Sequence, residues 1–263
     1  MRKHRVLLCS CLEYLAFYLC RYNLPPVLPV LIAHFNVTHG EIGTLASMGF
    51  VSYAIILLPA GFLGDAFGSQ KVVTLGAIVS VISNILFSYA SSFPTALAFQ
   101  FLNGLGQGMA WGPLTRLISD RYPKENIELV MSILLVPPNI GPTLAYTVSS
   151  YLATNYDWRA AFLYPPAALL VLTGLFWLLI KNQPSHLSGK EDEHISIKER
   201  FSLVLSNRNL WFIALAYSCY MYISRCLLIW LPTYLVEETH LSPFSASILG
   251  GLATLSGIGP MFI

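Results

Sequence analysis

Charged residues are scarce in this chain. Of its 263 residues only 11% are Asp, Glu, Lys or Arg, whereas 55% are hydrophobic, and the formal net charge is +2. The mean hydropathy of +0.62 lies outside the usual range of soluble domains. Apolar stretches of about 20 residues, the length that crosses ~30 Å of hydrocarbon, recur along the whole sequence. The sequence therefore predicts an all-α polytopic protein embedded in a lipid bilayer.

The chain also has few residues that could bind a metal or act in catalysis. Its five cysteines fall inside predicted spans without metal-ligand spacing, and its six histidines lie in tails and loops without a ligand pattern. The sequence contains no Ser/His/Asp, Cys/His or paired-carboxylate arrangement. We therefore predict no catalytic residue, no metal site, no cofactor, no enzymatic activity and no nucleic-acid partner.

Eight apolar segments are predicted to span the membrane. They cover residues 6–32, 42–64, 72–90, 95–117, 129–153, 158–180, 210–235 and 244–263. The single long polar segment, residues 181–209, separates the first six from the last two and is interpreted as a linker. We expect a six-helix bundle over 1–180, a cytoplasmic linker over 181–209 and the start of a second bundle over 210–263. The last segment ends without a polar cap or a basic flank, which indicates a truncated second bundle.

The basic residues predict the orientation of the chain. Cytoplasmic loops carry an excess of Lys and Arg. With the N-terminus in the cytoplasm, twelve of the 15 Lys and Arg residues lie on the cytoplasmic side and only Arg159 lies outside. The remaining two, Arg21 and Arg225, fall within predicted spans. We therefore expect a cytoplasmic N-terminus.

Each of these two arginines ends a stripe at helical positions i, i+4 and i+7. The stripes are Tyr14, Tyr18 and Arg21 in the first segment, and Ser218, Tyr222 and Arg225 in the seventh. An arginine at mid-bilayer costs about 2.5–3.5 kcal/mol on insertion scales, so such residues face the bundle interior or a water-filled cavity. Two guanidinium forks aimed at one cavity suit an anion such as a phosphate ester. The alternative is that each arginine pairs with a carboxylate or with backbone carbonyls and only locks helices together; Glu13 is the only acid inside a predicted span.

The segment after the second span reads Gly61-Phe62-Leu63-Gly64-Asp65-Ala66-Phe67-Gly68-Ser69-Gln70-Lys71. It resembles the loop signature of the major facilitator superfamily, with Ala66 where that signature has a basic residue. By this resemblance the chain has the superfamily fold: a complete N-terminal six-helix bundle and the first one to two helices of a C-terminal bundle. The resemblance also implies that Gly61, Asp65, Gly68 and Lys71 form a conformational latch.

Within that superfamily the chain is similar to the organophosphate:phosphate antiporters. The similarity rests on Tyr14, Tyr18, Arg21 and Asn23 in span one, Leu102-Asn103-Gly104, Gln107-Gly108-Met109, Trp111, Pro113 and Arg116 in span four, and Tyr222, Arg225, Trp230, Pro232, Tyr234 and Leu235 in span seven. It implies a monomeric secondary carrier of a bacterial inner membrane that exchanges a phosphate ester for a phosphate counter-anion by alternating access. The implied substrate-binding residues are Arg21, Arg225, Tyr14, Tyr18, Tyr53, Tyr222 and Asn139.

Three basic residues expected by this resemblance are absent, because Tyr22, Leu57 and Pro138 occupy their positions. The cavity is then less positive, and a monoanionic carboxylate is an alternative substrate. Two other functions stay open: a membrane sensor of sugar phosphates related to the carriers, and an inactive truncated remnant.

Two further patterns have structural interpretations. Prolines 137, 138 and 142 should break the fifth span near mid-membrane and free carbonyls toward the cavity, or else only kink the helix. The glycines at 104, 106, 108 and 112 lie inside a span with no strand before them. We therefore interpret them as sites of close helix packing and not as a phosphate-binding loop.

Overall fold

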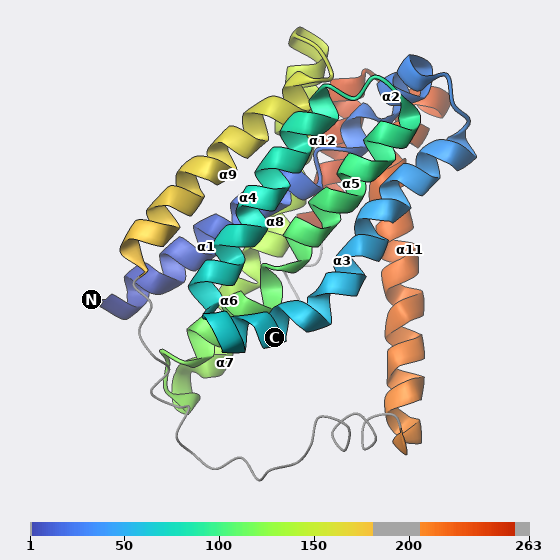
Figure 1. Ribbon diagram of the computed structural model, residues 1–263. Helices are drawn as coiled ribbons and strands as arrows, with labels where there is room; N and C mark the ends of the chain where they lie inside the picture. The colour runs from blue at the N-terminus through green and yellow to red at the C-terminus, as the bar shows by residue number, and fades with distance from the viewer. Residues whose placement is uncertain (1, 181–205, 256–263) are drawn as a thin grey trace.

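The computed structural model describes residues 2–180 and 206–255, and these residues form helices with no strand among them (Figure 1). The first six predicted spans contain α1 (Arg2–Arg21), η1 (Pro25–Val27), α2 (Leu28–Phe35), α3 (His39–Phe67), α4 (Ser69–Ser88), α5 (Phe93–Gly108), α6 (Trp111–Ser119), η2 (Lys124–Asn126), α7 (Ile127–Leu134), α8 (Val136–Asn155) and α9 (Ala160–Leu179). The last two contain α11 (Arg208–Thr239) and α12 (Pro243–Leu255). Most of the predicted linker and the last eight residues, 256–263, lie outside the described residues.

Six helical stretches in the described ranges are long and apolar enough to cross a membrane, and α12 is a shorter apolar helix. The predicted fourth span is divided into α5 and α6, of 16 and 9 residues, by a bend at Met109 and Ala110. The predicted all-α fold with a complete first bundle and the first two helices of a second is confirmed.

Prolines explain two other breaks. The first span stops being helical after Arg21, shortly before Pro25 and Pro26. The fifth is broken at Leu135, and the first turn of α8 contains prolines, which lack the N–H that an interior helical position needs. The predicted break is thus confirmed.

A carbonyl that the prolines leave without its helical N–H partner does not point into the cavity, contrary to our expectation. The carbonyl of Ile133, whose usual partner would be the missing N–H of Pro137, accepts a weak hydrogen bond from the Cys11 thiol on α1 at 3.8 Å. Ile133 does not line the central cavity, so the prediction that carbonyls are freed toward the cavity is wrong at this position.

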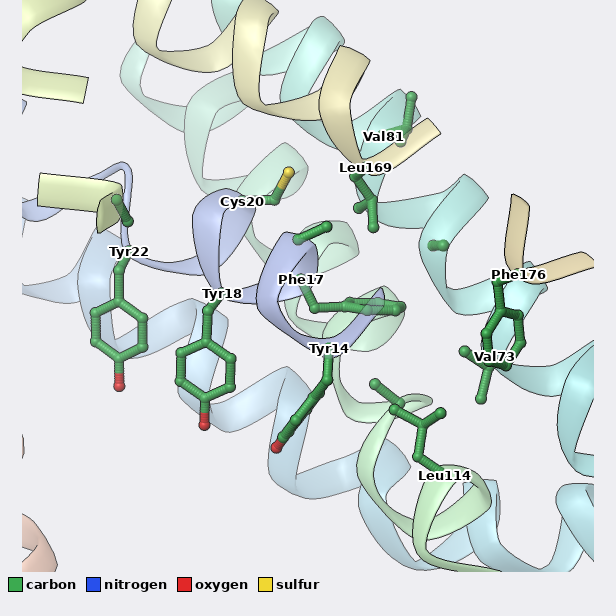
Figure 2. Packing of buried hydrophobic residues seen from close by; sticks show 14 of the residues in the cluster. Tyr14, Phe17, Tyr18, Cys20, Tyr22, Val73, Val81, Leu114, Leu169 and Phe176 are labelled. Carbon is green, nitrogen blue, oxygen red and sulfur yellow. The ribbon is translucent and has the colours of Figure 1, made fainter. Parts of the chain in front are cut away.

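Helix α1 lies at the centre of the first bundle, packed against α8 and α9, while α4 packs on α5 and α9 and α3 packs on α5 (Figure 1). A core of buried side chains from α1, α4, α6, α8 and α9 surrounds Phe17 and Phe176 (Figure 2). Helices α4 and α5 cross where two glycines meet: a Cβ added to Gly106 would lie 2.6 Å from the Gly76 carbonyl oxygen. This contact supports helix packing as the role of the glycines in α5.

In the second bundle α12 packs against α8, and α11 packs against α12 and η1. Thr143 Oγ1 donates to the Gly251 carbonyl at 2.7 Å, and Ser150 Oγ donates to the Pro243 carbonyl at 3.0 Å. The buried Tyr146 hydroxyl donates to the Leu228 carbonyl of α11. These bonds hold the start of the second bundle beside the first, so side chains of α11 can reach a cavity built mainly by α1, α3 and α5.

Candidate functional site

A cavity of about 540 Å³ lies between the first bundle and α11. Residues of α1, α3, α5, α6 and α11, together with Tyr22, line it: Tyr18, Arg21, Tyr22, Ala46, Gly49, Phe50, Tyr53, Ala54, Leu57, Gln100, Asn103, Gly104, Gln107, Trp111, Tyr217, Met221 and Arg225. Among the described residues that form this lining, the two arginines are the only charged ones, and no Asp or Glu belongs to it. The cavity therefore carries two positive charges without an internal counter-charge.

Arg21 is the last residue of α1, and its guanidinium reaches the end of α5. Its Nε donates to Gln107 Oε1 at 3.0 Å and its Nη2 donates to the Gln107 carbonyl at 3.3 Å. The guanidinium also lies over the rings of Tyr18 and Tyr53, at 4.9 and 4.6 Å from their centroids. Helix C-termini and aromatic faces both attract cations. Uncharged groups thus hold Arg21 while its charge remains uncompensated.

A buried hydrogen-bond network fixes Gln107. Its Nε2 donates to Ser80 Oγ at 2.8 Å, and Ser80 Oγ donates to Asn103 Oδ1 at 2.7 Å. Asn84 Nδ2 donates to the same oxygen at 3.0 Å, and Asn84 Oδ1 accepts from Asn23 Nδ2 at 2.8 Å. All five side chains are at most 3% exposed. The network orients the amide oxygen of Gln107 toward Arg21.

These network residues were not predicted as part of the site, although the sequence contains a signal for them. Ser80 and Asn84 are four residues apart in the apolar helix α4, and Asn103 and Gln107 are four residues apart in α5. Residues four apart share a helix face. Two polar pairs on apolar helices therefore indicate a polar contact between those helices.

Arg225 is held from the opposite side of the cavity by a tyrosine of the first bundle. Its Nη1 donates to the Tyr22 hydroxyl, and its Nη2 lies 3.9 Å from the Met221 sulfur. The ring of Tyr22 stacks on that of Tyr18, with centroids 5.6 Å apart and an interplanar angle of 9°. Tyr22 stands where the resemblance leads us to expect a lysine, so a neutral oxygen contacts Arg225 in place of a third cation.

Four of the seven predicted site residues line the cavity, and the other three do not. Arg21, Arg225, Tyr18 and Tyr53 line the cavity. Tyr14 lies behind the lining, 3% exposed, with its ring 5.1 Å from Tyr18. Figure 2 shows Tyr14, Tyr18 and Tyr22 in a row with their hydroxyls toward the same side.

Tyr222 and Asn139 do not line the cavity. Tyr222 is 72% exposed, and Asn139 bonds to its own helix through the Leu135 carbonyl. The face of α11 toward the cavity carries Tyr217, Met221 and Arg225, at four-residue spacing. The predicted stripe through Tyr222 is thus corrected: this residue lies about 100° around the helix from Met221.

The predicted latch lies at the junction of α3, α4 and α6. Asp65 pairs with Arg116 Nη1 at 3.4 Å, and Arg116 Nε pairs with Asp120 at 3.1 Å. Gly68, with φ of 93°, joins α3 to α4 in a conformation that favours glycine. A Cβ added to Gly112 of α6 would lie 3.6 Å from the Cα atom of Gly61, and Lys71 is exposed in the first turn of α4. The latch role of these residues remains a prediction.

A family model described as Major Facilitator Superfamily matches residues 7–263. The chain belongs to this superfamily. It is 26% identical over 279 residues to the probable hexose phosphate transport protein of Chlamydia trachomatis, covering 96% of this chain and 61% of the relative. It is 28% identical over 253 residues to the glycerol-3-phosphate transporter of Bacillus subtilis, covering 88% of this chain and 56% of the relative. The chain thus spans about three fifths of the length of the curated relatives it matches.

The fold is also that of a solved superfamily structure. The crystal structure of a bacterial homolog of the human lysosomal transporter Spinster, inward-facing and unoccupied, matches 97% of this chain and 60% of its own chain, with a TM-score of 0.83 and 18% identity. At this identity the match shows the fold alone. This superfamily member is a multi-pass membrane protein, and the two relatives above are named as transport proteins.

Proposed function

We propose that this chain forms the anion-binding part of a secondary carrier that exchanges a phosphate ester for inorganic phosphate by alternating access. The observation that carries the proposal is the pair Arg21 and Arg225 in one cavity whose lining, as far as the structure describes the chain, contains no acid. In the described residues neither arginine forms an ion pair with a carboxylate. This arrangement favours an external anion over the alternative that the arginines only lock helices together.

The binding step follows from the charges. Two guanidinium groups around one cavity repel each other, and an anion between them removes that repulsion. An ion pair at ~4 Å contributes about 4 kcal/mol at an effective dielectric near 20, before the cost of desolvation. The planar forks match phosphoryl oxygens, and the Tyr22 and Tyr53 hydroxyls add hydrogen bonds without adding charge. A dianionic phosphoryl group uses both cations, whereas a carboxylate uses them only partly.

The transport step follows from the placement of the two arginines. Arg21 belongs to the first bundle and is fixed by Gln107, while Arg225 belongs to the second bundle. An anion bound by both connects the two bundles at the cavity, so their relative motion can carry the site from one side of the membrane to the other. We further propose a bacterial inner membrane location, a cytoplasmic N-terminus and a monomeric carrier.

The named relatives carry hexose phosphate and glycerol-3-phosphate, which supports a phosphate ester over the carboxylate alternative. Proteoliposomes that contain the carrier of which this chain forms the anion-binding part, preloaded with inorganic phosphate, test the proposal. We expect uptake of labelled glycerol-3-phosphate or glucose 6-phosphate that requires internal phosphate. Binding without uptake would favour the sensor alternative, and neither binding nor uptake would favour the inactive remnant.

A further inference from the structure

A fully buried carboxyl group lies between α1 and α9, outside the cavity. Glu13 is 0% exposed and is not among the residues that line the anion site. Its Oε1 lies 2.8 Å from Thr173 Oγ1, and its Oε2 has no hydrogen-bond partner. Among the described residues it forms no ion pair. A buried carboxylate with a single hydrogen bond and no cation is strongly disfavoured.

The hydrogen count at Thr173 indicates which form of Glu13 is present. Thr173 Oγ1 lies 2.8 Å from Glu13 Oε1 and 2.7 Å from the Leu169 carbonyl oxygen. A hydroxyl has one hydrogen, so it can donate to only one of these two oxygens. If Glu13 is protonated, its O–H donates to Thr173, and Thr173 donates to Leu169. Both short contacts are then hydrogen bonds, which an ionised Glu13 does not allow.

The helices around Glu13 supply no charge to offset it. The sequences of α5, α8 and α9 contain no Asp, Glu, Lys, Arg or His. Lys71 of α4 and Glu128 of α7 are exposed, and Arg116 of α6 pairs with two aspartates. None of these three groups offsets the charge of an ionised Glu13, because Lys71 and Glu128 are in contact with solvent and Arg116 is already paired.

The groups beside Glu13 on α1 are neutral or already engaged. Cys9 and Cys20 are free thiols, and the buried hydroxyl of Ser10 has no hydrogen-bond partner. The tyrosine side chains nearby, such as Tyr14, are uncharged phenols. Arg21 is two turns away and bonded to Gln107.

We infer that Glu13 is a proton-binding site: its side chain is a neutral carboxylic acid at pH 7 and donates its O–H to Thr173 Oγ1. The proton is held inside the interface of α1 and α9, and its release requires water to enter between these helices. Occupancy of the site therefore reports on separation of α1, the helix that carries Arg21, from α9. The inference is independent of the proposed transport activity.

Infrared spectroscopy of the chain in lipid nanodiscs at pH 7 tests this site. Exposed Asp and Glu side chains are ionised at this pH. We expect the carbonyl stretching band of a neutral carboxylic acid in the wild-type chain, its loss in Glu13→Gln, and its retention in the matched control Glu128→Gln. Thr173→Val removes the hydroxyl with little change of shape, and we expect the band to shift as the acid loses its hydrogen-bond acceptor.

Two results would overturn the inference. The first is a wild-type spectrum at pH 7 without a neutral-acid band, which requires no variant to fold. The second is a band that persists unchanged in Glu13→Gln, because the protonated acid then lies elsewhere.

Discussion

Substitution of the Gln107 amide is the sharpest test of the claim that Arg21 has only neutral hydrogen-bond partners and therefore binds an anion. Gln107→Glu is nearly isosteric, but it places a carboxylate where an amide oxygen now accepts from Arg21 Nε at 3.0 Å. The guanidinium then has an internal ion-pair partner, and the net charge of the cavity lining falls from two positive charges to one. The change should abolish tight binding of a phosphate ester while leaving the fold intact.

The magnitude follows from Coulomb's law. Two unit charges roughly 5 Å apart repel by about 3 kcal/mol at an effective dielectric near 20. Since 1.4 kcal/mol corresponds to a tenfold change in affinity, each negative charge of the ligand weakens binding by roughly 100-fold. Gln107→Leu adds no charge and removes one hydrogen bond to a charged group, about 1.5–3 kcal/mol, so it should cost about 10- to 100-fold.

Calorimetric titration of glucose 6-phosphate or glycerol-3-phosphate into nanodiscs containing the chain measures these effects. Thermal unfolding of each variant in the same nanodiscs controls for loss of fold. The reasoning predicts that Gln107→Glu binds more weakly than Gln107→Leu although its charge suits Arg21. Equal affinity of Gln107→Glu and the wild-type chain would refute it, because Arg21 would then not be the group that meets the anion.

Two other positions have matched controls in the same chain. Tyr22→Phe removes the hydroxyl that accepts from the charged Arg225 and, in the same titration, should weaken phosphate-ester binding by about 10- to 100-fold, the equivalent of a hydrogen bond to a charged group of about 1.5–3 kcal/mol. Tyr222→Phe, at a residue 72% exposed, should have no effect on the affinity. A larger loss in Tyr222→Phe than in Tyr22→Phe would place Tyr222 in the site. Gly106→Ala should lower the unfolding temperature, because its Cβ would lie 2.6 Å from the Gly76 carbonyl oxygen and such overpacking costs about 1–3 kcal/mol. Gly174→Ala should leave the unfolding temperature unchanged, because a Cβ there has nothing within 4 Å. Equal unfolding temperatures of the two variants would contradict the close contact of α4 and α5 at Gly76 and Gly106.

The fold was predictable because the pattern that specifies it is local. Apolar stretches of membrane length, the polar segment after residue 180 and the proline cluster of the fifth span each determine a span or a break without reference to the rest of the chain. The break before Pro25 and Pro26 was not predicted, because residues 6–32 were expected to form one span. The bend at Met109 and Ala110 precedes Pro113, which lacks the N–H that would pair with the Met109 carbonyl, but the sequence analysis did not predict this bend.

The site was predictable only in part, and α11 shows why. Arg225 belongs both to the stripe through Ser218 and Tyr222 and to the stripe through Tyr217 and Met221, so spacing alone cannot decide which face meets the cavity. Packing of α11 against the first bundle decides it, through contacts such as that of Tyr146 with the Leu228 carbonyl. The hydrogen-bond partner of Arg225 was also unpredictable, because Tyr22 lies 203 residues earlier in the sequence and only the packing of the two bundles brings the side chains together.

The central claim is that Arg21 and Arg225 bind one anion together. A double-mutant cycle on phosphate-ester affinity tests it most directly, with Arg21→Lys, Arg225→Lys and the double variant titrated in nanodiscs, and with Arg208→Lys on the same helix as control. A lysine keeps the charge but loses the fork, so each single variant should lose at least tenfold in affinity. The double variant should lose far less than the product of the two single losses, because the anion already bound by one fork is what the other contacts. Independent, multiplicative losses, or wild-type affinity in either single variant, would contradict a shared site.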